Sequence, residues 1–192
     1  MAETLFIPIL LGTNRNGRES GQAARWIFSK MQEREEIDPV FFDARDFHLP
    51  TEDYGQDIKD TFPEWRDAVI KADGLVIVTP EYNHGYPGVL KSILDILLKE
   101  YIHKPVAFAA VSKQMWGGTR VIENLLPVVR ELGLAPTFTD LNFPKISSKF
   151  DENGEIKEEI YNKLCKEFLD ELVWMARTFK YGRENFPSKY HQ

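Results

Sequence analysis

The segment of residues 80–88 holds several side chains that could bind a ligand. It reads Pro-Glu-Tyr-Asn-His-Gly-Tyr-Pro-Gly and follows a short apolar run. Its backbone N–H groups and the Asn83 amide could hydrogen-bond the polar edge of a planar heterocycle. Tyr82, His84 or Tyr86 could then shield the face of that ring. Because no obvious nucleophile with a base stands among these residues, we expect a seat for a flat ligand rather than a site that attacks a substrate.

The segment of residues 12–20, Gly-Thr-Asn-Arg-Asn-Gly-Arg-Glu-Ser, has the residue types of an anion-binding loop. Gly17 can adopt the positive φ that lets successive N–H groups converge on an anion. A helix is expected to begin at the end of this segment, and the N-terminus of a helix attracts negative charge. Two hydroxyls and two guanidinium groups complete the set: Thr13, Ser20, Arg15 and Arg18. Together they would suit a phosphate monoester.

Two familiar nucleotide-binding patterns do not fit this first segment. A P-loop needs Gly-Lys-Ser/Thr, whereas Arg18 and Glu19 follow Gly17. The dinucleotide pattern G-x-G-x-x-G is also absent. A plainer alternative stays open on these residues alone, in which Ser20 only caps a helix and the two arginines are solvated.

A third polar segment, residues 112–118, reads Ser-Lys-Gln-Met-Trp-Gly-Gly and follows another apolar run. It could approach the same ring from another side if its strand ends beside the strand that precedes residues 80–88. Ser112 has no apparent His or Asp partner near it in the sequence, so a hydrolase triad has little support.

Apolar runs alternate with helical patterns along the chain, and these elements must position the three segments. We expect five strands, at Leu5–Leu11, Val40–Phe42, Leu75–Val78, Pro105–Val111 and Ala135–Leu141. Apolar residues at helical spacing predict helices at about residues 20–34, 65–72, 88–99, 119–132 and 156–180. Residues 44–60 are polar and rich in turn-forming residues, which predicts a long loop.

Short apolar strands separated by helices indicate an α/β three-layer sandwich, a parallel sheet covered by helices on both faces. In the strand order 2-1-3-4-5 the switch point lies between strands one and three, where the first two polar segments would meet. Open α/β sheets bind their ligands at such a point. No linker or internal repeat interrupts the pattern, so we expect residues 1–192 to form a single domain.

The composition narrows the classes of partner. The chain has 192 residues and a formal net charge of −6, with Lys and Arg scattered, which is unsuited to binding nucleic acid or an anionic membrane. It shows no membrane-spanning apolar run and no signal-peptide pattern, so we expect a cytoplasmic protein. The lone Cys165 allows no disulfide within the chain and is expected to lie in the core. The histidines share no metal-ligand spacing, so we expect no metal site.

These residues together resemble the NADPH-dependent FMN reductase family, flavodoxin-like enzymes that include FMN, quinone, azo-dye and chromate reductases. Three stretches carry the resemblance over roughly residues 4–140. They are similar to the family's phosphate loop (Gly12, Thr13, Arg15 and Ser20), its flavin-ring loop (residues 80–91 with Asp95) and its third loop (Lys104–Val106, Ser112, Gly117 and Gly118). The segment Lys113-Gln114-Met115 departs from the glycine-rich sequence common in that third loop.

The resemblance implies a flavodoxin-like domain with FMN as cofactor and NADPH or NADH as co-substrate. The FMN phosphate would bind at Thr13, Arg15 and Ser20, to which the pattern of the loop adds Arg18. The isoalloxazine ring would contact Pro80, Glu81, Tyr82, Asn83, Ser112, Trp116, Gly117 and Gly118. His84 and Tyr86 would line the substrate pocket.

In such an enzyme hydride would pass from the nicotinamide to flavin N5 and then to a second acceptor, which could be a free flavin, a quinone, an azo dye or a metal oxyanion. No protein side chain would need to be catalytic, because the cofactor carries the chemistry. Two alternatives stay open: a flavodoxin-like electron carrier, and a flavin-binding interaction protein that responds to redox state.

The resemblance also implies self-association to a homodimer or homotetramer. The helix expected at residues 88–99 would lie at the subunit contact. Leu97 and Leu98, which fall on adjacent faces of that helix, would allow it.

Overall fold

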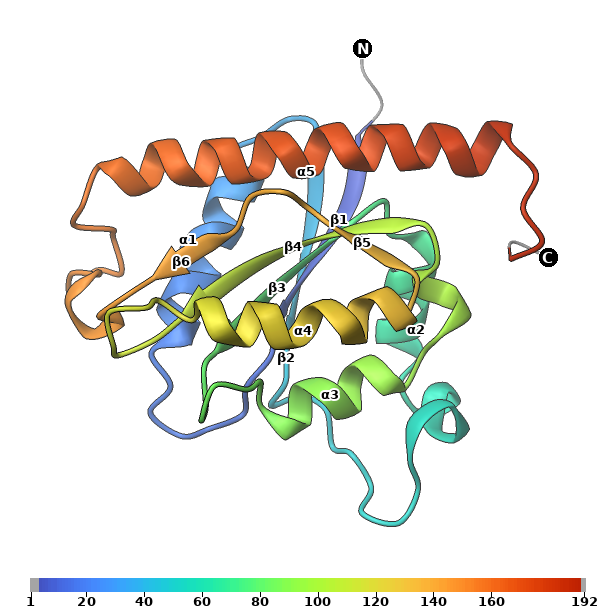
Figure 1. The fold of residues 1–192 in the computed structure, drawn as a ribbon, viewed down its shortest axis with the longest axis horizontal. Helices are drawn as coiled ribbons and strands as arrows, with labels where there is room; N and C mark the ends of the chain where they lie inside the picture. Colours follow the sequence, from blue (N-terminus) through green and yellow to red (C-terminus); the bar gives the residue numbers. More distant parts are fainter. Residues whose placement is uncertain (1–3, 191–192) are drawn as a thin grey trace.

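The computed structural model describes residues 4–190 (Figure 1). Its strands are β1 (Leu5–Leu11), β2 (Ile37–Asp43), β3 (Leu75–Pro80), β4 (Lys104–Val111), β5 (Leu134–Pro136) and β6 (Leu141–Phe143). Its α-helices are α1 (Ser20–Gln32), α2 (Pro63–Lys71), α3 (Gly88–Asp95), α4 (Thr119–Glu131) and α5 (Ile160–Asn185). Short 3₁₀ helices occupy Gly55–Thr61, Lys99–Tyr101 and Ile146–Ser148.

The strands form a parallel sheet in the order β2-β1-β3-β4-β5, with β6 also paired to β4. This confirms the predicted α/β architecture and strand order. β3 and β4 are apolar almost throughout because both faces of a central parallel strand are covered. The carboxyl ends of β1, β3 and β4 share one edge of the sheet, and each of the three polar segments leaves the sheet from that edge.

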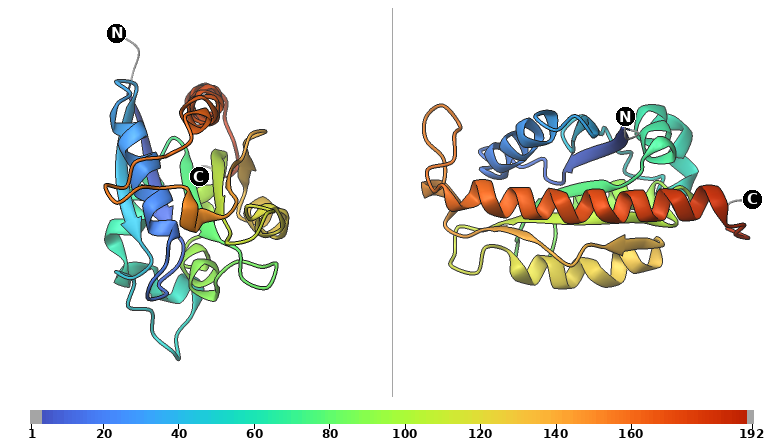
Figure 2. Two further views of the ribbon diagram at one scale, coloured as in Figure 1. Left: turned by 90° about the vertical axis from the view of Figure 1, so that its left-hand side faces the viewer. Right: turned by 90° about the horizontal axis from the view of Figure 1, so that it is seen from above.

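Helices cover the two faces of the sheet in separate apolar layers. Neighbouring residues of a strand point to opposite faces, so β4 contributes Ala109 to one layer and Phe108 to the other. α1 and α5 cover the first face, and α2, α3 and α4 cover the second. Figure 2 shows α5 running along the sheet with α1 and α4 on either side of it. The helices cover the faces of the sheet, and the loops that follow the strands lie at its carboxyl edge.

The predicted fifth strand, Ala135–Leu141, is wrong in one respect, because the chain forms two short strands there. Pro136 of β5 pairs with Val106 and Leu141 of β6 pairs with Ala109, so five steps along this edge match three along β4. The excess forms a bulge at residues 137–140, in which Phe138 is 93% exposed. Thr137 Oγ1 donates to the Thr139 carbonyl, and this local hydrogen bond turns the chain away from the sheet.

Other expectations are corrected at their boundaries. β2 begins at Ile37 rather than Val40, and the expected loop 44–60 contains the 3₁₀ helix Gly55–Thr61. The last helix begins at Ile160, four residues later than predicted, and continues to Asn185. The helix expected at residues 88–99 ends at Asp95, and Leu97, one of the two leucines expected to allow a subunit contact, lies in the core at 1% exposure. Cys165 is buried, as predicted.

Within residues 4–190 no helix is both long enough and apolar enough to cross a membrane. The same residues contain no group of three His, Cys, Asp or Glu side chains placed to hold a metal ion.

Candidate active site

A cavity of about 270 Å³ lies at the carboxyl edge of the sheet, where the loops after β1, β3 and β4 converge. It is lined by Arg15, Arg18, Glu19 and Ser20 from the first loop, Pro80, Glu81 and Tyr82 from the second, Val111, Ser112, Lys113 and Gln114 from the third, and Ile146 after β6. The tertiary structure therefore gathers the three polar segments around one space.

Ser20 has the most informative environment in this cavity. It is 3% exposed, and its Oγ has no hydrogen-bond partner within residues 4–190. Ser20 is the first residue of α1, and the first N–H groups of a helix have no acceptors within the helix. The Glu19 side chain, at the N-cap, does not accept from them either. A buried hydroxyl left unpaired costs about 1–3 kcal/mol. An anion bound in the cavity would accept hydrogen bonds from Ser20 and from the helix terminus.

Thr13 and Tyr82 connect the first loop to the second. Thr13 Oγ1 lies 3.2 Å from the Tyr82 hydroxyl, and Thr13 is 1% exposed. The Arg15 guanidinium lies 5.8 Å from the centroid of the Tyr82 ring, within the range of a cation–π contact. Arg15 therefore lines the cavity with its charge held beside the ring loop.

Arg18 is engaged by the protein itself. Its guanidinium donates to both carboxylate oxygens of Asp43, at the end of β2, and to the Thr13 carbonyl. The Arg18 side chain is 5% exposed. Burial disfavours the ionised form of Asp43, but hydrogen bonds from Arg18 and from the Arg45 N–H keep its pKa below the usual value. Arg18 thus fixes the path of the first loop by a bidentate pair, in addition to lining the cavity.

The second loop, at residues 80–88, contains a tight hairpin whose turn has two residues. Tyr82 and Gly85 exchange both backbone hydrogen bonds at 2.9 Å, and the residues between them, Asn83 and His84, have φ values of 50° and 67°. Positive φ at both central positions is the geometry of a type I′ turn. Asn tolerates this conformation readily and His less so, which makes His84 a strained position.

Residues of α4 hold this strained turn in place. Asn124 Nδ2 donates to the His84 carbonyl at 2.9 Å, and Arg120 Nη1 lies 3.0 Å from His84 Nε2. Asn83 and His84 are exposed and do not belong to the cavity lining given above. Tyr86 is half-buried against the layer formed by α2, α3 and α4, so it also lies outside that lining.

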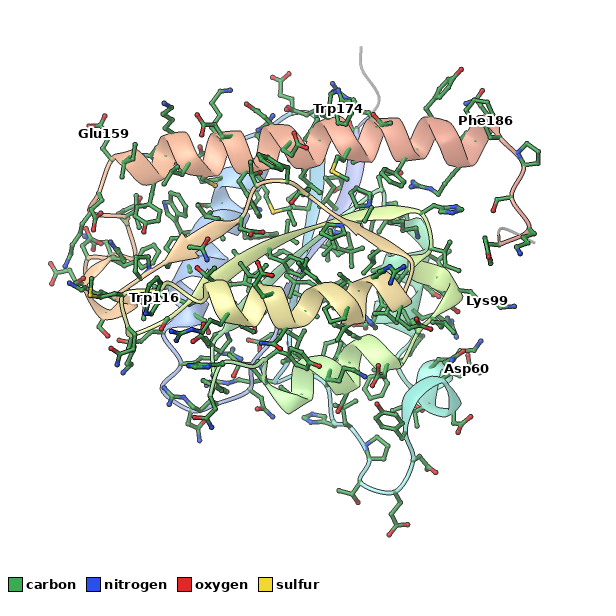
Figure 3. All side chains as sticks on the ribbon, in the orientation of Figure 1. Asp60, Lys99, Trp116, Glu159, Trp174 and Phe186 are labelled. Carbon is green, nitrogen blue, oxygen red and sulfur yellow. The ribbon has the colours of Figure 1, made fainter. Side chains whose placement is uncertain are left out.

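The third loop is hydrogen-bonded to β6, the strand that was not predicted from the sequence as a separate element. Ser112 N–H donates to the Phe143 carbonyl of β6, and the Ser112 carbonyl accepts from Ile146. Gly117 and Gly118 have positive φ, and a Cβ on Gly118 would lie 2.6 Å from Ala110 Cβ. The two glycines are therefore required for packing against β4 and β6, whatever the loop binds. Trp116 is 64% exposed and stands at the edge of the molecule beside the start of α4 (Figure 3).

Glu19 and Lys113 form an ion pair across the cavity, with Nζ–Oε2 at 3.1 Å. Burial disfavours the ionised carboxylate of Glu19, but the Ser147 hydrogen bond and Lys113 lower its pKa below the usual value. This pairing offsets the repulsion that an ionised Glu19 would exert on a bound anion.

Five residues of the lining were not among the residues predicted from the sequence: Glu19, Val111, Lys113, Gln114 and Ile146. Position within the loops after β1 and β4 could have indicated the first four. Ile146 carries no sequence signal, because it reaches the cavity only through the pairing of β6 with β4.

The fold and the cavity define a flavodoxin-like α/β protein, with the N-terminus of α1 beside an aromatic-bearing loop at the switch point of the sheet. The model of the NADPH-dependent FMN reductase family matches residues 7–146, and the chain belongs to that family. It is an FMN-dependent NAD(P)H oxidoreductase, which confirms the family, the activity and the cofactors expected from the sequence.

Curated relatives and solved structures agree with this membership. A 2-hydroxy-1,4-benzoquinone reductase of Burkholderia sp is 29% identical over 183 residues, covering 90% of this chain and 97% of the relative. A quinone reductase of Escherichia coli K12 is 33% identical over 128 residues, covering 62% of this chain and 66% of the relative. The structure of FerB, an NAD(P)H:acceptor oxidoreductase of Paracoccus denitrificans, superposes with a TM-score of 0.75 at 19% identity and covers 92% of this chain and 99% of its own. This last likeness concerns the fold.

Proposed function

We propose that the cavity binds FMN with its phosphate at Ser20, Arg15 and the N-terminus of α1. The observation that carries this assignment is the buried Ser20 hydroxyl, which has no hydrogen-bond partner within residues 4–190 and belongs to a residue of the cavity lining. A phosphate would accept charge-assisted hydrogen bonds from Ser20 and Arg15. The residues present therefore fit the group that the family binds.

The remaining residues of the site hold and orient the ligand. Arg18, paired with Asp43, fixes the first loop, and Arg45 Nη2 donates to the Arg15 carbonyl at 2.9 Å. Pro80–Tyr82 and Ser112–Gln114 follow adjacent paired strands and both line the cavity, so the edge of the ring would lie against them. When bound, FMN supplies two-electron transfer between NAD(P)H and an acceptor. Because the turn at Asn83–His84 is preformed, little ordering free energy is lost when the ring binds.

The second substrate is proposed to be a small planar acceptor such as a quinone. Support comes from the relatives, which are named as reductases of 2-hydroxy-1,4-benzoquinone and of quinones. Exposed Trp116 and Met115 beside the cavity add an apolar surface on which a planar acceptor could stack.

We further propose a homodimer or homotetramer that uses the exposed face of α3. On that face Lys91 and Asp95 form an ion pair at 2.6 Å, and the Tyr54 hydroxyl donates a hydrogen bond to Asp95 Oδ2.

A cytoplasmic location is proposed from the single free, buried cysteine, which suits a reducing compartment.

The decisive experiment is a visible-absorption titration of the purified protein with FMN, followed by anaerobic addition of NADPH. We expect FMN to bind and its absorbance to bleach, with continuous NADPH oxidation once a quinone is added. Uptake of FMN without NADPH oxidation would instead indicate an electron carrier. A protein that binds no FMN would contradict the proposal.

Substituting Arg15 tests the assignment of the phosphate end. Arg15→Ala should weaken FMN binding by about 1.5–3 kcal/mol, because a hydrogen bond to a charged group is lost. The matched control is Arg25→Ala, which removes the same charge from an exposed position of α1 outside the lining. Equal FMN affinities of the two variants would reject the assignment.

A further inference from the structure

The flavin-ring loop and the third loop meet at Arg120, whose only role so far is to hold the turn at His84. Arg120 lies in the first turn of α4, and its Nη1 is 3.0 Å from His84 Nε2 and 3.8 Å from Glu81 Oε1. Glu81 lines the cavity, so Arg120 lies next to a residue of the cavity lining. The position joins both loops proposed to hold the ring.

The chemistry around Arg120 combines a cation with exposed apolar surface. Its guanidinium lies 5.4 Å from the centroid of the Trp116 ring. The Arg120 side chain is 43% exposed, and Met115 and Trp116 are 75% and 64% exposed. Large apolar side chains this exposed are typical of a surface that a ligand covers, and Met115 directly follows Gln114 of the cavity lining.

The hydrogen bond with His84 orients the guanidinium without occupying it. Arginine can only donate, so His84 Nε2 accepts and the proton of the neutral ring lies on Nδ1. A guanidinium has five N–H donors, and within residues 4–190 one of them serves His84. Glu81 Oε1 forms an ion pair with the guanidinium at 3.8 Å, but this distance is too long for a hydrogen bond. The planar fork therefore retains donors for an oxygen of a ligand stacked beside Trp116.

We propose that Arg120, backed by Trp116, forms an anion site on the acceptor side of the cavity and selects planar acceptors that carry an ionised oxygen, such as ionised hydroxyquinones. This inference rests on the proposed function. In the reaction the ionised acceptor gains the hydride equivalent of NAD(P)H and two protons from solvent, which yields the neutral trihydroxyarene and NAD(P)⁺. Arg120 binds the ionised oxygen of the oxidised acceptor, so it sets specificity and takes no electrons or protons.

The test compares two acceptors that differ in charge. One is 2-hydroxy-1,4-naphthoquinone, which is ionised at neutral pH, and the other is 2-methoxy-1,4-naphthoquinone, which is neutral. Steady-state kcat/KM is measured for each with the FMN-loaded enzyme and saturating NADPH. Dividing each variant's value by the wild-type value for the same quinone removes the difference in intrinsic reactivity between the two compounds.

For Arg120→Ala we expect kcat/KM for the ionised quinone to fall about tenfold, the effect of losing one charge-assisted hydrogen bond, and kcat/KM for the neutral quinone to stay within about twofold. Arg120→Lys should recover part of the loss because it keeps the charge but not the planar fork. The control Arg130→Ala removes an exposed charge at the far end of α4 and should leave both values unchanged.

Equal losses for both quinones would overturn the proposal, because Arg120 would then act only by holding the turn at His84. A raised KM for NADPH with unchanged preference between the quinones would overturn it in favour of a dinucleotide contact. Absence of FMN bleaching by NADPH in the wild type would mark failure of the proposed function itself, and with it of this inference.

Discussion

Both ends of the sheet contain buried polar side chains, but the two ends use them differently. At the amino end, Asp73 is 4% exposed and accepts from the Phe6 N–H at 3.1 Å, from Arg183 at 2.9 Å and from Lys180 at 3.2 Å. At the carboxyl end, Ser20 is equally buried and has no partner within the described residues. Buried polar groups that satisfy one another stabilise the fold, whereas the unpaired Ser20 hydroxyl belongs to a residue of the cavity lining, where a bound ligand could pair with it.

Lys104 extends the contrast between the two ends. It belongs to a stretch that resembles the family's third loop, yet it lies at the start of β4, at the end of the sheet away from the cavity. Its Nζ donates to the carbonyls of Val69 and Ile70 at the C-terminus of α2. A cation there interacts favourably with the last carbonyls of the helix. The role of Lys104 is therefore structural.

The largest effect should follow from breaking the network at the amino end. Asp73→Ala leaves Lys180 and Arg183 without this carboxylate and should lower the free energy of unfolding by about 3–5 kcal/mol, as measured by urea denaturation. FMN affinity of the folded variant should stay unchanged, because the cavity is at the opposite end. Should the alanine variant fail to fold, Asp73→Asn, which keeps an acceptor for the Phe6 N–H, replaces it. A change in FMN affinity as large as the loss of stability would argue against separate roles for the two ends.

A second effect depends on pH. Burial, with a smaller contribution from the Arg183 charge, lowers the pKa of Lys104 from 10.5 to about 8. Between these values the unfolded chain binds the extra proton, so the free energy of unfolding should rise with pH by up to about 3 kcal/mol from this group. Lys104→Met should lack that rise. Urea midpoints of both proteins from neutral to alkaline pH test this, and parallel curves would contradict it.

The smallest effect should distinguish the carboxyl end. Ser20→Ala should leave the stability of the FMN-free protein unchanged or slightly higher, since the buried hydroxyl is unpaired there, yet weaken FMN binding by about 1.5 kcal/mol. Ser29→Ala is the matched control, because Ser29 lies on the same helix and its hydroxyl donates to the Trp26 carbonyl at 2.8 Å. Thermal unfolding without FMN and titration with FMN measure the two quantities. A destabilised FMN-free Ser20→Ala protein would mean that the hydroxyl has a structural partner.

Local patterns were sufficient for most of the fold. The elements β1, β3 and β4 were predicted from their apolar runs, and α1, α4 and α5 from the helical spacing of their apolar residues. In each of them the same pattern continues over the whole element. The bulge at residues 137–140 could not be predicted, since Thr137, Phe138 and Thr139 are residue types that favour strands and the interruption is decided by pairing with β4. For the same reason Ile146 could not be placed at the cavity.

Assignments within the site divide in a similar way. The residue types of the first loop predicted an anion site, but not which arginine is consumed by the protein. Asp43 engages Arg18 from the end of β2, far along the chain from the loop, and this leaves Arg15 beside Tyr82. A guanidinium pairs with whichever carboxylate the fold places beside it, and sequence separation gives no measure of that distance.

The sequence by itself determined the architecture, the family and the three segments that surround the cavity, because apolar period, turn residues and loop composition are local properties of the chain. Only the tertiary structure decided which side chains in those segments are already satisfied and which are open to a ligand. Arg18 and Lys104 donate hydrogen bonds to neighbouring residues, whereas the buried Ser20 hydroxyl has no hydrogen-bond partner within the described residues. Arg120 contacts residues of both the second and the third loop. Hydrogen bonding and burial depend on distances across the fold, and residue order does not specify those distances.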